Sequence, residues 1–122
     1  MARFEDSLLR QLDRDREVQV RTRRRDGSTA DVPIWIVTVD GEPYVRSYLA
    51  ERGAWYQRAR AEGRMTLVVR GQAVPVVVQP AGDDDLNRRV SEAFTAKYGT
   101  GAPARAMVSS AVVATTLRLT PD

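Results

Sequence analysis

Residues 32–39 read VPIWIVTV and carry apolar side chains on both faces of an extended chain. Because successive side chains of a strand point to opposite faces, Val32, Ile34 and Ile36 share one face, and Trp35 lies on the other. A strand that is apolar on both faces lies centrally and is covered from both sides. The proline in this stretch is compatible with the start of such a strand but not with its middle. We therefore expect residues 32–39 to form a central strand.

Shorter strands are predicted on both sides of this stretch. Asp26-Gly27 and Asp40-Gly41 are dipeptides typical of hairpin turns between strands. The other predicted strands are residues 17–23, 42–48, 65–69, 74–78 and about 112–119. Six short strands joined mainly as hairpins predict a mainly β fold, a six-stranded antiparallel barrel with flanking helices.

Helical spacing is confined to three segments. They are residues 4–13 within an N-terminal segment 1–16, residues 53–62, and residues 84–98. The last segment has the clearest pattern, because apolar side chains recur every four residues from Leu86 to Tyr98. Gly63 is expected to end the second helix. The three acids at 83–85 are expected to begin the third, where they complement the helix dipole.

Composition narrows the classes of function. The length fits one domain spanning residues 1–122, with the barrel at 17–121. The chain has no cysteine and no histidine, which excludes disulfides, thiolate catalysis and the commonest zinc and haem ligands. A cation site made only of the carboxylates at 83–85 remains an alternative to the preferred interpretation of these acids as a helix start.

The sequence has no run of ~18 apolar residues, and its first residues are polar. We therefore expect a cytoplasmic protein without a membrane partner.

Arginine supplies almost all of the positive charge, yet the net charge is only +3. This charge is small for a protein that binds a phosphate backbone, and the arginines are not interleaved with stacking aromatics. We therefore expect no nucleic-acid partner.

Several short motifs carry a resemblance to a known family. They are residues 22–27 (TRRRDG), 33–35 (PIW), 44–48 (YVRSY), 55–56 (WY), 97–99 (KYG) and 114–119 (ATTLRL). The first four resemble the deazaflavin-dependent nitroreductase-like split barrels, with Arg24 and Arg25 as the basic pair of that pattern. As a set, they are most similar to an uncharacterised bacterial branch of the split-barrel flavin/deazaflavin-binding superfamily, which has the pyridoxamine-phosphate-oxidase-like fold.

The resemblance implies a homodimer of six-stranded split barrels with a cofactor in a groove at the subunit interface. The two apolar faces of residues 32–39 also favour a homodimer, because one small barrel cannot cover both. Relatives bind FMN, the deazaflavin F420, sometimes haem, or nothing known. Asp26 and Ala30 stand where the deazaflavin binders carry a small hydroxyl and often a base. FMN is therefore favoured over F420, and a chain without any cofactor stays open.

A cofactor phosphate is expected at the end of the strand over residues 42–48. Arg46 and Ser47 are the leading candidates to hold it, helped by Arg52 or Arg58. Pairing of Arg46 with Glu42 or Glu51 is the alternative interpretation.

Two further groups complete the candidate cofactor-binding residues. Arg24 and Arg25 are candidates for the phosphate, unless they form a solvated hairpin end. Trp35, Tyr48 and Trp55 are candidates to stack on a cofactor ring, with core or dimer interface as the alternative.

The function that follows is an oxidoreductase in which a flavin or deazaflavin exchanges hydride with an unknown small molecule. No catalytic residue and no metal ligand is predicted, because in such enzymes the cofactor carries the chemistry. The alternative is a non-catalytic module, either a cofactor carrier or a dimer without cofactor.

Overall fold

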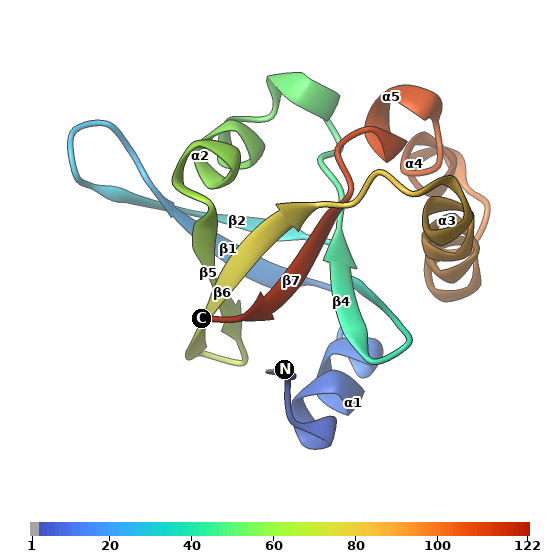
Figure 1. Ribbon diagram of the computed structural model, residues 1–122, viewed down its shortest axis with the longest axis horizontal. Coiled ribbons are helices and arrows are strands. Elements are labelled where there is room, and N and C mark those ends of the chain that lie inside the picture. The colour runs from blue at the N-terminus through green and yellow to red at the C-terminus, as the bar shows by residue number, and fades with distance from the viewer. Residues whose placement is uncertain (1–2) are drawn as a thin grey trace.

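The computed structural model of the protein describes residues 3–122 (Figure 1). Within this range, seven strands form one curled antiparallel sheet in the order β2-β1-β5-β6-β7-β4-β3. The strands are β1 Val18–Arg23, β2 Thr29–Ile34, β3 Val37–Val39, β4 Glu42–Val45, β5 Arg64–Val69, β6 Gln72–Pro80 and β7 Leu117–Pro121. The helices are α1 Asp6–Arg14, α2 Ala54–Glu62, α3 Asp84–Tyr98, α4 Ala102–Ala106 and α5 Ser110–Val113, with a 3-10 turn η1 at Ala50–Arg52. The predicted mainly β antiparallel fold is confirmed, with seven strands rather than six.

Residues 32–39 do not form the single central strand that their pattern predicts. The chain leaves β2 after Ile34 and enters β3 at Val37, and these two strands are the opposite edges of the sheet. An edge strand tolerates the proline near the end of β2, because it does not need a donor on its open side. The prediction was wrong because it took apolar character on both faces as evidence for a central position.

Each apolar face is covered by a different cluster of buried side chains. The first cluster fills the inside of the curled sheet and includes Ile34 and Ile36. The second cluster lies between β3, β4 and α3, and it includes Val37 and Phe94. Figure 1 shows α3, α4 and α5 gathered beside β4, whereas α2 lies on the other side, where it packs against β1 and β5. The two clusters explain why a segment at the sheet edges has no polar face.

Side chains from the end of α3 satisfy the backbone at the break between β2 and β3. The Tyr98 hydroxyl accepts a hydrogen bond from the backbone N–H of Ile36 at 3.1 Å and donates to the carbonyl of Arg16 at 2.9 Å. The Lys97 ammonium donates to the Ile36 carbonyl at 2.8 Å and to the Leu12 carbonyl near the end of α1. The chain can therefore leave one edge of the sheet and enter the other without leaving these buried groups unpaired.

The three predicted helices are confirmed. The carboxylate of Asp83 caps α3 by accepting from the backbone N–H of Leu86 at 2.8 Å. Gly63 ends α2 in the left-handed conformation, with φ of 76°, and its N–H bonds to the Ala59 carbonyl. Among residues 3–122, no helix has both the length and the apolar character needed to cross a bilayer.

Two of the predicted strands are shorter in the structure. The strand predicted over 42–48 ends at Val45, and the strand predicted over 112–119 begins only at Leu117. Part of the latter is helical because the hydroxyls of Thr115 and Thr116 each donate to the carbonyl three residues earlier, at 2.6 Å. Such local bonds hold the backbone in a turn and compete with a sheet ladder.

Replacing Tyr98 by phenylalanine tests the hydroxyl at the break. Tyr98→Phe leaves the Ile36 N–H without an acceptor but keeps the aromatic ring, so the free energy of unfolding should fall by about 1–3 kcal/mol. Urea denaturation measures this change. Tyr48→Phe is the control, since the Tyr48 side chain is largely exposed. Equal stability of the two variants would show that the hydroxyl does not support the break.

Candidate functional site

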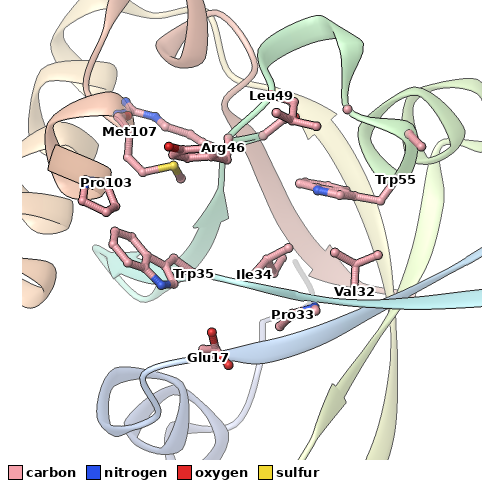
Figure 2. Close-up of a pocket in the computed structure, with 14 residues that line it drawn as sticks. Glu17, Val32, Pro33, Ile34, Trp35, Arg46, Leu49, Trp55, Pro103 and Met107 are labelled. Atoms are coloured by element: carbon pink, nitrogen blue, oxygen red, sulfur yellow. The ribbon is translucent and has the colours of Figure 1, made fainter.

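A cavity of about 370 Å³ opens between β2, the chain after β4, the start of α2 and the end of α4 (Figure 2). Its lining residues are Glu17, Val32, Pro33, Ile34, Trp35, Arg46, Ser47, Tyr48, Leu49, Gly53, Ala54, Trp55, Pro103 and Met107. Figure 2 shows Trp35 and Trp55 on opposite sides, with Ile34 of β2 between them and Val32 below Trp55. A mostly apolar cavity with a few convergent polar groups is typical of a small-molecule site.

Arg46 lies in the wall of this cavity, and its side chain is almost completely buried, with 1 % exposed. Its guanidinium donates to the hydroxyls of Thr116 and Ser91 at 2.8 and 2.9 Å. It also donates to the carbonyls of Met107 and Asn87 at 3.0 and 3.1 Å. The Arg46 guanidinium thus donates four hydrogen bonds to other residues of the protein. These bonds join the end of β4 to α3, to the end of α4 and to the residues just before β7.

The charge of Arg46 has no carboxylate partner within residues 3–122. Of the glutamates considered as its partner, Glu42 instead lies 3.6 Å from the side chain of Arg118. Burial lowers the pKa of Arg46 to about 10, so the guanidinium is still protonated at neutral pH. The wall of the cavity thus contains a buried positive charge that only neutral groups solvate.

Ser47 is the second polar residue in the wall. It is fully buried, and its Oγ has no hydrogen-bond partner among the described residues. Its backbone N–H bonds to the Thr115 hydroxyl at 2.9 Å, which fixes the residue in place. A Cβ atom on Gly53 would lie 2.2 Å from this Oγ, so a larger residue there would force the Ser47 side chain to move. Because buried hydroxyls are nearly always paired, the Ser47 hydroxyl can bond to an ordered water or to a molecule in the cavity.

Aromatic residues shape the rest of the cavity. Trp35 is half-buried and stacks on Tyr98 with ring centroids 4.0 Å apart and nearly parallel planes. Trp55 is buried and packs edge-on against Tyr56. Tyr48 and Leu49 lie at the mouth with 57 % and 53 % of their surface exposed.

Five of the nine predicted site residues line this cavity, namely Trp35, Arg46, Ser47, Tyr48 and Trp55. The other four lie elsewhere. Arg24 and Arg25 are exposed in the hairpin between β1 and β2, and Arg24 donates to the Thr29 carbonyl at 2.9 Å. Arg52 is exposed in η1, and Arg58 lines a separate hollow.

The sequence patterns did not indicate two further parts of the wall. Pro103 and Met107 reach the cavity from α4 and its end, in a segment for which no helix was predicted. Glu17 lies on the other side of β2 from most of the lining side chains in Figure 2. Only the fold brings these residues to the cavity, so no local spacing could have identified them.

Residues 8–119 match a family described as "Uncharacterized protein conserved in bacteria (DUF2255)". No curated protein matches the chain. Solved structures do match it, and three of them illustrate the range of their cofactors.

The first is HutZ, the heme storage protein of Vibrio cholerae, with a TM-score of 0.69, 14 % identity and coverage of 98 % of this chain and 91 % of HutZ. The second is an F420-H2-dependent reductase, with a TM-score of 0.63, 12 % identity and coverage of 86 % and 93 %. The third is a FAD-binding protein of Mesorhizobium loti, with a TM-score of 0.56, 17 % identity and coverage of 98 % and 91 %. At these identities the likeness concerns the fold alone, and it confirms the predicted split-barrel fold.

Removing the buried guanidinium should destabilise the protein. Arg46→Ala leaves a space in the wall and takes donors from Thr116, Ser91 and the Met107 carbonyl, so the free energy of unfolding should fall by about 2–4 kcal/mol. The exposed Arg52→Ala is the matched control and should stay within about 0.5 kcal/mol of the wild type. Chemical denaturation measures both. An Arg46→Ala protein as stable as the control would mean that the network does not hold the wall.

Proposed function

The chain belongs to the bacterial DUF2255 family and has the split-barrel fold, and we propose that it binds a flavin-type cofactor in the cavity beside β2. We further propose that the bound cofactor exchanges hydride with a small molecule. One observation carries the proposal: a mostly apolar, aromatic cavity has a buried positive charge and a partnerless buried hydroxyl side by side in its wall, from Arg46 and Ser47.

The residues present fit such a cofactor. Trp35 and Trp55 offer apolar surface for a flat ring. Arg46 supplies a positive potential for an anionic group, although most of its N–H groups bond to the protein. Ser47 supplies a free hydroxyl. When bound, a flavin would supply the hydride chemistry, and the protein would supply position and electrostatics, for which neither histidine nor cysteine is needed.

The names of the structural neighbours support a cofactor-binding module. One is an F420-H2-dependent reductase, one binds FAD and one stores heme. For this chain FMN is the proposed cofactor and F420 is less favoured. Asp26 replaces a small hydroxyl of the deazaflavin pattern, and its carboxylate accepts from the backbone and side chain of Ser28 at 2.9 and 2.6 Å. This turn does not line the cavity, so the preference for FMN over F420 follows only from the departure from the deazaflavin pattern.

A non-catalytic cofactor carrier is the second candidate. Besides Arg46 and Tyr48, Glu17 is the one ionisable side chain in the wall. A site with so few proton-transferring groups suits binding as well as it suits turnover. Reduction of the bound cofactor by a supplied reductant, followed by reoxidation with a small acceptor, distinguishes an enzyme from a carrier.

Titration of FMN and F420 into the cofactor-free protein, followed by fluorescence, tests the cofactor. FMN should bind more tightly than F420, and tighter F420 binding would contradict the proposal. In the same titration, Ser47→Ala should weaken FMN binding by about tenfold, because it removes a hydrogen bond to a charged group.

The stability of the cofactor-free Ser47→Ala protein should be unchanged, since the hydroxyl has no partner within residues 3–122. Ser7→Ala, at an exposed serine of α1 that does not line the cavity, is the matched control and should bind FMN like the wild type. Unchanged FMN affinity in Ser47→Ala would remove Ser47 from the site.

We also propose a homodimer in which a second copy covers the mouth of the cavity. Tyr48 and Leu49 are the two large apolar side chains that stand exposed in the described part of the chain, and both lie at that mouth. Exposed apolar surface beside a binding cavity is typical of an interface.

Sedimentation at micromolar concentration should therefore give twice the chain mass of 13.6 kDa. Leu49→Asp should shift the protein towards the monomer, because a carboxylate would be buried at the interface. A wild-type protein that sediments as a monomer would refute the dimer.

A further inference from the structure

Strands β1 and β5 separate at one point of the sheet, and a hollow of about 180 Å³ lies there. They pair only over Gln19–Arg21 of β1, and the last pair joins Arg21 to Thr66. β1 then continues to Arg23 with β2 as its partner, while β5 starts at Arg64 with β6 as its partner. We call this hollow the β1–β5 fork. In Figure 1 the β1–β2 hairpin extends away from the rest of the sheet past α2.

Four arginines and two acids line the β1–β5 fork. The charge of Arg21 is already paired, because its guanidinium makes two hydrogen bonds to the Asp31 carboxylate, at 2.8 and 3.0 Å. Arg64 has only a 3.5 Å contact with Asp122, in a largely exposed pair that contributes little. Arg23 and Arg58 make no ion pair within residues 3–122. The fork thus contains two arginines that make no ion pair, a third that is weakly held, and one carboxylate, that of Glu62, which makes no ion pair either within residues 3–122.

Arg58 is positioned over the fork by α2. Its side chain is half-buried, and its guanidinium lies 3.4 Å from the hydroxyl of Thr22, which is itself buried. This contact is at the long limit for a hydrogen bond, so it leaves the guanidinium free to donate to something else. Arg58 does not line the cofactor cavity, and neither do the ends of β1 and β5.

We propose that the β1–β5 fork is a second binding site, separate from the cavity, that takes a small oxyanion such as a phosphate group. Arg23 and Arg58 hold the anion, with Arg64 and the Thr22 hydroxyl beside it. Guanidinium groups bind phosphate oxygens with paired, charge-assisted hydrogen bonds, and unpaired arginines around one small hollow suit that chemistry. The Asp122 carboxylate lies 3.5 Å from Arg64, and a bound anion would compete with it for this arginine.

Calorimetric titration of inorganic phosphate into the purified protein tests this site. We expect saturable binding, and Arg58→Ala should raise the dissociation constant about tenfold or more. Arg23→Ala should have a similar effect without altering the packing of α2, because Arg23 is exposed. Arg10→Ala, which removes the same charge from the exposed face of α1, should leave the constant unchanged. Binding that is absent, or that Arg10→Ala weakens as much as Arg58→Ala, would overturn the proposal.

The same titration in the presence of saturating FMN separates this site from the cofactor site. If the two are distinct, phosphate still binds, and Arg58→Ala leaves the FMN affinity unchanged. If FMN displaces phosphate and Arg58→Ala weakens both, the fork belongs to the cofactor site and a separate site is refuted. If phosphate binds as expected but FMN does not bind at all, the proposed function fails while the fork site stands.

Discussion

The buried guanidinium of Arg46 holds together the segments that form one wall of the cavity. Hydrogen bonds from this one side chain reach α3, the end of α4 and the approach to β7, which are 41 to 70 residues away in the sequence. A charge without a carboxylate partner is costly to bury, so it stays in place only while all these acceptors surround it. The position of Met107, the shape of the wall and the positive potential beside Ser47 all depend on this network.

The break between β2 and β3 depends on a second long-range contact. Tyr98 and Lys97 satisfy the backbone of Ile36, which lets one stretch of chain supply both edges of the sheet. The curled sheet then carries one apolar cluster inside and another under α3. Since Trp35 stacks on Tyr98, the same contact also places an aromatic wall of the cavity.

The sequence predicted those features that local patterns determine. The cap of α3 at Asp83, the end of α2 at Gly63 and the hairpin turns follow from residues close in the chain. The break after Ile34 could not be predicted, because the groups that stabilise it come from the end of α3. Arg46 was predicted as a site residue, but its burial was not predicted, because the groups that surround it come from distant parts of the chain. Met107 was not predicted to line the cavity for the same reason.

The visible absorbance spectrum tests the central claim, that this cavity holds a flavin-type cofactor, most directly. It is recorded on freshly purified protein, and again after incubation with FMN and removal of the unbound cofactor. The account predicts a flavin spectrum in at least the second sample, and its loss when the same procedure is applied to a folded variant with the cavity filled, such as Ala54→Trp at an exposed lining position. A folded wild-type protein that stays colourless after incubation with FMN, and equally with F420, would contradict the account.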